Sequence, residues 1–263
     1  PTVDYNLWLG PAPEKPVMRR QFHYDWHWQW AYGNGDIGNQ GIHEMDKARW
    51  GLGKTKLPKS ALSLGGRFGY VDDGETPNTQ LVFLEYDDSW IIFEVRGLPT
   101  NDLRGARVGN IWYGTKGIVV SNSYSSAVAY DLLGNKIASF DGGGDHHRNF
   151  IEAVRSRKPA MLNCDVEEGH LSAALFHLGN ISYRLGAEEP FSNKTKRFGD
   201  GNNEVWETIG RFEDHLAANG IRLENAVYRL GRKLTVDAAK EQFVGDEEAN
   251  RLLTRQYRPP FVV

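Results

Sequence analysis

The chain has 263 residues, of which 40% are hydrophobic and 12% aromatic, and this is enough apolar surface for a substantial core. Its net charge of −3, with acids and bases intermixed, provides no basic surface for a phosphate backbone, which argues against a nucleic-acid partner. No apolar run reaches the roughly 18 to 20 residues of a membrane span. We therefore expect a soluble protein. The single Cys164 does not decide whether the compartment is the cytoplasm or the periplasm.

Residues 1–35 are rich in aromatic residues, proline and glycine and show no lasting periodicity, so we predict an ordered arm that packs by its rings. Trp26, Trp28 and Trp30 alternate, and in an extended arm their indoles would share one face. Indoles stack on the apolar face of a pyranose, which makes Trp26 and Trp28 candidate sugar-binding residues. The alternative is that the indoles bury the arm against the protein. Arg19 and Arg20 are expected to be solvated.

The stretch "YGNGDIGNQGIH" contains a literal G-x-G-x-x-G at Gly33, Gly35 and Gly38. A dinucleotide-binding fingerprint requires a buried strand before the glycines and an acidic residue about 20 positions later. The preceding text is "HYDWHWQWAY" and the text near position 55 is "GKTKLP", so the context is wrong. We predict instead that the glycines permit a tight entry into a helix capped by Asn34 or Asp36.

Residues 36–52 have a helical pattern. At about 100 degrees per residue, Asn39, His43 and Asp46 fall on one stripe of this helix beside Trp50. An imidazole exchanges a proton near neutral pH, and a carboxylate can orient it. This grouping suits the binding and deprotonation of a polyol, although three polar residues also fit an ordinary solvated face.

Residues 60–141 consist of short β-branched and aromatic runs separated by turn residues, with Gly134-Asn135 predicted to join two strands in a tight hairpin. Short connections favour antiparallel pairing. Helices are predicted at about 146–157, 166–185, 204–219 and 246–255. The expected fold class is α+β, with one large, predominantly antiparallel open sheet and helices packed on one face. Residues 146–263 are expected to be mainly helical.

His170, His177 and Arg184 fall along one edge of the predicted 166–185 helix, and His147 could approach the same place. The histidines are seven residues apart, which is too far for a short chelate, so we predict no metal site. His177 is expected to be structural, whereas His170 and His147 remain candidates for substrate binding.

Several segments, taken in order, resemble the C-terminal domain of the Gfo/Idh/MocA oxidoreductases. These are "NLWLGPAP", "WHWQWAYGNGDIGNQGIHEMDKARWGLG", "HLGNISYRLG", "EDHLAANGI" and "FVGDEEANRLLTRQYRPPFVV". The resemblance implies a two-domain parent enzyme, with an N-terminal Rossmann domain that binds NAD or NADP and an α+β domain that forms the substrate site and the oligomer interface. This chain matches the second domain only, and its first residues, "PTVDYNLWLG", suggest a piece of a longer protein.

The resemblance assigns a role to His43. The family's helix carries an Asp, then a His four residues later, then a further Asp; here the positions are Asn39, His43 and Asp46. His43 therefore resembles the histidine that exchanges a proton with the substrate hydroxyl while hydride passes to the nicotinamide. Asn39 and Asp46 would position substrate hydroxyls, although Asn39 could not act as a base. The family's catalytic lysine lies in a Glu-Lys-Pro of the other domain, and Lys15 in "PAPEKPV" is taken as coincidence.

We therefore expect a substrate-binding and oligomerisation domain of an NAD(P)-dependent oxidoreductase that acts on a sugar, polyol or glycoside hydroxyl. The chain alone is expected to be inactive and to bind NAD or NADP weakly, because the cofactor domain is absent, and to form a homo-oligomer through its sheet. Two alternatives stay open: a cofactor-independent sugar hydrolase or lyase, which would use a pair of carboxylates, and a non-catalytic carbohydrate-binding module.

Overall fold

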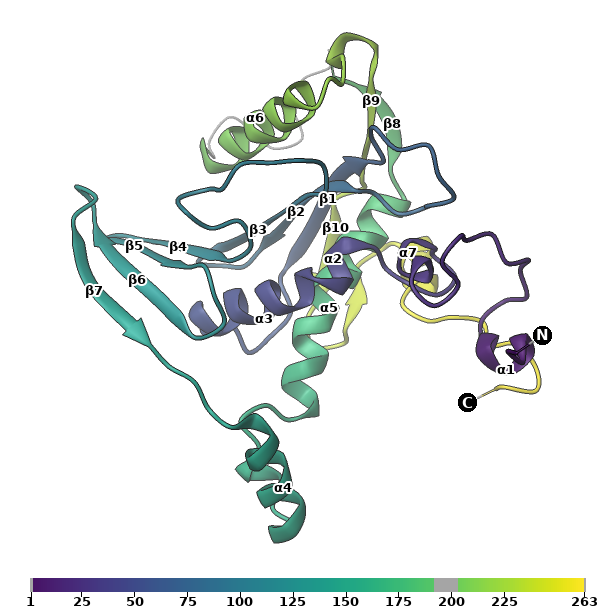
Figure 1. Cartoon of the computed structure of the whole chain (residues 1–263), viewed down its shortest axis with the longest axis horizontal. Helices are drawn as coiled ribbons and strands as arrows, with labels where there is room; N and C mark the ends of the chain where they lie inside the picture. The colour runs from purple at the N-terminus through teal and green to yellow at the C-terminus, as the bar shows by residue number, and fades with distance from the viewer. Residues whose placement is uncertain (1, 192–202, 263) are drawn as a thin grey trace. The chain divides into compact units, whose positions relative to one another are not determined.

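The computed structural model describes residues 2–191 and 203–262. They form two compact units, and the chain crosses between the units several times. Unit 1 comprises residues 1–41, 58–99 and 176–263, and unit 2 comprises residues 42–57 and 100–175. The helices are α1 (Tyr5–Leu9), α2 (Asp36–Asn39), α3 (Gly41–Gly51), α4 (His146–Ser156), α5 (Val166–Arg184), α6 (Asn203–Ala218) and α7 (Glu247–Arg251) (Figure 1).

The sheet of unit 1 has the order β11-β10-β1-β2-β3, and β9 joins β1 and carries β8 beyond it. Its strands are β1 (Ser60–Gly66), β2 (Thr79–Glu85), β3 (Trp90–Arg96), β8 (Ala187–Pro190), β9 (Val227–Leu230), β10 (Leu234–Asp237) and β11 (Gln242–Phe243). Every described pairing is antiparallel, and β1 pairs with β2 over its whole length. The open antiparallel sheet of the predicted α+β fold is therefore confirmed.

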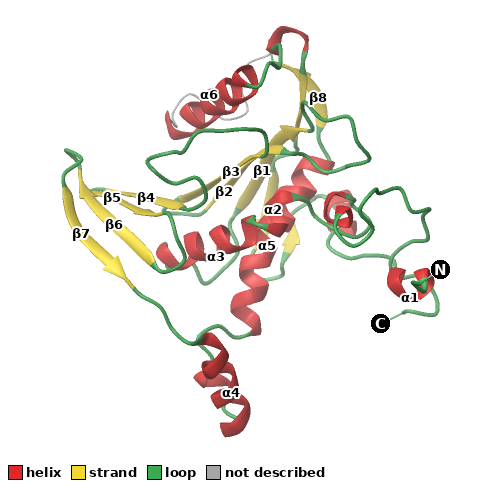
Figure 2. Cartoon of the chain, in the orientation of Figure 1, coloured by secondary structure: helices red, strands yellow, loops and turns green. Residues whose placement is uncertain are grey.

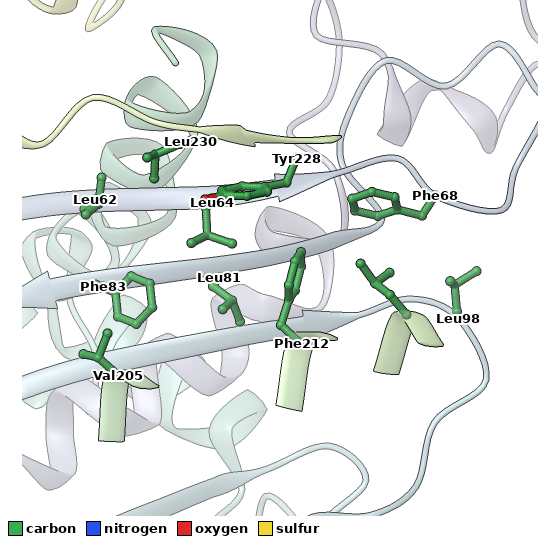
Figure 3. Close-up of a cluster of buried hydrophobic side chains, with 11 residues drawn as sticks. Leu62, Leu64, Phe68, Leu81, Phe83, Leu98, Val205, Phe212, Tyr228 and Leu230 are labelled. Carbon is green, nitrogen blue, oxygen red and sulfur yellow. The ribbon is translucent and has the colours of Figure 1, made fainter. Parts of the chain in front are cut away.

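The core of unit 1 lies between this sheet and α6. Alternate side chains of β1 and β2 point to this face, because successive residues of a strand point to opposite sides. They pack against Val205, Phe212 and Leu216 of α6 (Figure 3). The sheet residues in this cluster are Leu62, Leu64, Leu81 and Phe83, each at most 5% exposed.

The opposite face of the same strands is also covered. Val82 is fully buried, and a β-carbon on Gly179 of α5 would lie 2.8 Å from the Val82 side chain. Ser182 of α5 accepts a hydrogen bond from the Ser63 backbone amide at 2.9 Å. The expectation of helices on one face was thus incomplete, because β1 and β2 are buried on both sides.

Unit 2 contains a second, four-stranded antiparallel sheet with the order β4-β5-β6-β7 (yellow in Figure 2). Its strands are β4 (Asn110–Gly114), β5 (Gly117–Ser121), β6 (Ser126–Asp131) and β7 (Lys136–Asp141). The predicted hairpin at Gly134-Asn135 is confirmed: Gly134 has φ +85°, and the Asp131 carboxylate accepts from the backbone amides of Leu133 and Asn135. Residues 60–141 thus supply two sheets, where one was expected.

The N-terminal arm packs by its rings, as predicted. Trp8 contacts Tyr5, Phe22 and Tyr32 at centroid distances of 5.1 to 5.9 Å. The C-terminal segment closes on the same arm: the Arg258 guanidinium donates to Asn6, Gly10 and Ala12, and its backbone amide donates to the Pro11 carbonyl at 3.0 Å. The arm is therefore tied to the end of unit 1 by hydrogen bonds as well as by aromatic packing.

The helices predicted after residue 146 are confirmed as α4, α5, α6 and the shorter α7, but strands β8 to β11 were missed. These strands are two to four residues long, too short for a period-2 pattern to be recognised. The predicted 36–52 helix is interrupted at Gln40, between α2 and α3. Its N-cap is Gly35, with φ +76° and no side-chain cap, so neither Asn34 nor Asp36 caps it.

Candidate functional site

The residues predicted for the site fall in both units. His43, Asp46, His147 and His170 belong to unit 2, whereas Asn39, Trp26 and Trp28 belong to unit 1.

His43 lies on an exposed face of α3. Its ring centroid is 5.5 Å from that of Tyr124, in an edge-to-face arrangement, and its side chain makes no hydrogen bond within the described residues. The imidazole nitrogens are therefore available to a ligand.

Lys47 lies one turn after His43 and contacts the same tyrosine, with Nζ 5.4 Å from the ring centre. Its ammonium group donates to Ser121 Oγ at 2.9 Å and to the Ser123 carbonyl at 2.7 Å, which anchors the β5–β6 loop to α3. Burial lowers the pKa of Lys47. Sequence reasoning missed both neighbours: the i, i+4 spacing could have identified Lys47, but nothing local indicates that Tyr124 reaches this helix.

Asp46 is not free to orient His43. Its carboxylate accepts a hydrogen bond from Ser172 on α5 and lies 3.9 Å from the Arg49 guanidinium. Arg49 is 1% exposed, donates to Ser172 Oγ at 2.8 Å and to the Lys54 carbonyl at 2.7 Å, and forms an ion pair with Glu168. Asp46 thus belongs to a network around the buried Arg49 guanidinium, and this network joins α3 to α5. A guanidinium enclosed in this way requires carboxylate partners.

His147 and His170 are both exposed. His147 lies in the first turn of α4, whose N-cap is Asp145, and its ring centroid is 4.0 Å from that of His146. His170 lies near the start of α5. Their proposed roles in substrate binding stay predictions.

In unit 1, Asn39 ends α2 with an exposed side chain that makes no hydrogen bond to another described residue. Trp26 and Trp28 lie in a 3-10 turn, Asp25–Trp28, so the expectation that alternating indoles share one face was wrong. At three residues per turn, positions two apart point in different directions. Trp28 donates from its indole nitrogen to Asp36 at 3.1 Å, and Trp26 stacks on His27 with centroids 3.9 Å apart.

The glycines of the G-x-G-x-x-G are occupied by packing. A β-carbon on Gly33 would collide with the backbone carbonyl of His27, and one on Gly38 would lie 2.6 Å from the Asn34 side chain. Gly35 has φ +76°, where a β-carbon would lie 2.9 Å from Thr76. The glycines thus face the protein's own backbone and side chains, and this stretch does not fit the phosphates of a dinucleotide.

In residues 2–191 and 203–262, no group of three or more His, Cys, Asp and Glu side chains is arranged to hold a metal ion. None of the helices in this part of the chain is both long enough and apolar enough to cross a membrane.

Comparisons with known proteins place the chain in a family. Residues 1–211 match the model of the oxidoreductase family C-terminal alpha/beta domain of Gfo/Idh/MocA type. No curated protein matches the chain.

Among solved structures, a Thermotoga maritima protein assigned to the oxidoreductases is 22% identical over 62% of this chain and 47% of its own, with a TM-score of 0.45. The WlbA dehydrogenase of Bordetella pertussis, in complex with NADH and UDP-GlcNAcA, is 19% identical over 64% and 49%, with a TM-score of 0.40. An Agrobacterium radiobacter oxidoreductase, in complex with NAD+, L-tartaric acid and magnesium, is 16% identical over 57% and 46%, with a TM-score of 0.38.

The chain spans about half the length of these structures. The family match extends over most of the chain, from the aromatic arm through α3 and strands β1 to β8 into α6. The chain therefore belongs to the Gfo/Idh/MocA oxidoreductase family, as a C-terminal alpha/beta domain.

Proposed function

We propose that this chain is the substrate-binding and oligomerisation domain of an NAD(P)-dependent oxidoreductase that acts on a sugar, polyol or glycoside hydroxyl. The observation that carries the proposal is the position of His43 within the family match: the imidazole stands on an exposed face of α3 with no hydrogen-bond partner among the described residues. An unpartnered imidazole is suited to accept a hydroxyl proton near neutral pH.

The residues of this chain have distinct parts in the proposed reaction. His43 accepts the hydroxyl proton, and Tyr124 supports the ring from the loop that Lys47 anchors. Asn39 hydrogen-bonds a hydroxyl without acting as a base. Trp26, Trp28, His147 and His170 are further candidates for substrate contact, while Asp46 holds α3 in place through Ser172.

The nicotinamide cofactor, when bound, supplies the oxidising power. We propose that a domain outside this chain holds it, because the glycines of residues 33–38 pack against protein atoms and form no phosphate cradle. The chain alone is then expected to bind NAD or NADP weakly and to be inactive.

The oligomerisation proposal rests on one face of the β4–β7 sheet. The registers place Ile111, Val120 and Val128 in one row across three strands, and Tyr113, Ile118 and Tyr130 in the next row of the same face. Tyr113 is 55% exposed, and most of the others are partly exposed. A contiguous apolar face of this kind favours association with a second copy.

The catalytic proposal is tested in the full-length protein by following reduction of NAD+ or NADP+ with a panel of sugars and polyols. His43→Gln is expected to lower kcat by about 10²- to 10⁴-fold, whereas His146→Gln, an exposed histidine of α4, leaves it unchanged. Turnover of a sugar without added nucleotide would instead support the hydrolase or lyase. Sugar binding without turnover, unaffected by His43→Gln, would support a binding module.

The oligomer is tested by sedimentation equilibrium. Tyr113→Glu and Ile118→Glu are expected to yield monomers, while Leu133→Glu, at a hairpin position that is 87% exposed, preserves the assembly. A wild-type monomer at high concentration would refute this part of the proposal.

A further inference from the structure

Trp30 of unit 1 contacts two arginines that are distant in sequence. The Arg255 Nη1 group donates to the Trp30 carbonyl at 2.8 Å and to the Ala31 carbonyl at 3.3 Å. The Arg184 guanidinium carbon lies 5.3 Å from the centre of the Trp30 ring. Both arginines are exposed, and within the described residues the Arg184 side chain has no hydrogen-bond acceptor. Trp30 therefore contacts one guanidinium at its indole ring and another at its backbone carbonyl.

His177 adds a third nitrogen group at this place. It lies on α5 two turns before Arg184. Burial and, secondarily, the charge of Arg255 lower the pKa of His177 to about 4. The same two causes, burial first, lower the pKa of Arg184. The positive charge of Arg255 thus acts on both His177 and Arg184.

The positive charge here is only partly balanced. Glu75 is the carboxylate that acts on Arg184, and its own oxygens are engaged elsewhere. Its Oε2 atom accepts from the Trp30 backbone at 2.8 Å, and its Oε1 atom lies 3.5 Å from Lys15 Nζ. The Glu75 carboxylate is thus shared between Arg184 and Lys15, and two cations that share one carboxylate leave a net positive charge, which favours an anionic ligand.

We propose that Arg184, at the Trp30 ring, and Arg255, at the Trp30 backbone, bind a phosphate group of a ligand. Guanidinium groups present paired N–H donors that match phosphate oxygens, and the free face of Arg184 and the unused nitrogens of Arg255 supply them. The Trp30 ring orients Arg184, and His177 can donate a further hydrogen bond as a neutral imidazole. The phosphate could belong to a phosphorylated sugar or to a dinucleotide. This inference is independent of the role of His43.

The site is tested by isothermal titration calorimetry of the full chain with inorganic pyrophosphate at low ionic strength. Arg184→Gln is expected to raise the Kd about tenfold or more, the loss of one charge-assisted interaction, and Arg255→Gln to do the same. Arg251→Gln, an exposed arginine of α7, is the matched control and should leave the Kd unchanged. Circular dichroism and thermal melting of each variant establish folding; Arg184→Gln removes only a ring contact and is expected to fold.

Competition identifies the source of the phosphate. Displacement of pyrophosphate by glucose 1-phosphate indicates a sugar phosphate, and displacement by NAD+ indicates the dinucleotide; either result supports the site. The proposal is overturned if the Kd is the same for wild type and Arg184→Gln, if Arg251→Gln weakens binding equally, or if neither competitor displaces pyrophosphate.

Discussion

The guanidinium carbon of Arg19 lies 4.2 Å from the centre of the Trp8 ring system. Phe22 at 4.4 Å and Tyr32 at 5.2 Å complete an aromatic enclosure around the same cation, which is 7% exposed. Arg19 Nε donates to the Phe22 carbonyl at 2.8 Å. The expectation that Arg19 is solvated was therefore wrong, because the rings of the arm close over it.

This enclosure predicts that Arg19 stabilises the arm. Arg19→Gln is expected to lower the free energy of unfolding by about 1 to 2 kcal/mol, since a desolvated cation–π contact of this kind contributes up to about 2 kcal/mol. Urea denaturation measures the change. Arg20→Gln, the exposed neighbour, is the control, and equal effects of the two variants would contradict the assignment.

A larger effect is expected at Arg49. Arg49→Met leaves the partly exposed carboxylates of Asp46 and Glu168 without their cation, and the loss of these charge-assisted interactions is expected to cost about 1.5 to 3 kcal/mol. Arg148→Gln breaks an exposed i, i+4 pair with Glu152 and should leave the free energy of unfolding nearly unchanged. Chemical denaturation of both variants separates the two cases; a small loss for Arg49→Met would mean that its network contributes little.

His215 predicts a pH dependence of stability. It is 5% exposed, neither ring nitrogen has a hydrogen-bond partner, and burial lowers its pKa from 6.5. As the pH falls below 6.5, the unfolded chain binds a proton that the native ring resists, so this contribution favours unfolding. His215→Leu is expected to be neutral or stabilising at pH 7 and to gain on wild type as the pH falls.

Thermal melts between pH 7 and 5 measure this difference. His146→Leu, at an exposed position, should follow the wild-type profile. Parallel profiles for His215→Leu and wild type would show that the ring is protonated as readily in the native state as in the unfolded state.

The glycines of residues 33–38 make a prediction that needs no ligand. Gly33→Ala is expected to destabilise the apo protein by about 1 to 3 kcal/mol, because the new methyl group overlaps the His27 backbone. Gly210→Ala, within α6 and with open space around it, should stabilise by about 0.5 to 1 kcal/mol. If Gly33→Ala melts like wild type, the glycine has a purpose other than packing.

Local patterns were enough to predict α4, α5, α6 and the 132–135 hairpin, because a helical period and a Gly-Asn turn depend only on residues that are close together in the sequence. The partners of the site residues were not predictable in this way. Asp46 accepts its hydrogen bond from Ser172, which is 126 positions away in sequence. That the Asp46 carboxylate is engaged by α5, and not by His43, therefore depends on tertiary packing. The aromatic alternation at Trp26 and Trp28 failed for a related reason: the Asp25 carboxylate accepts from the Gln21 amide and favours a tight turn over an extended arm.

The hydrogen bonds from Arg258 to residues 6–12 also bear on how the protein is made. These contacts join positions about 250 residues apart in sequence, so they form only when a segment of that length has brought its two ends together. During synthesis residues 6–12 therefore leave the ribosome long before Arg258 does. Until Arg258 emerges, the aromatic arm lacks these hydrogen bonds, and its rings are open to non-native contacts.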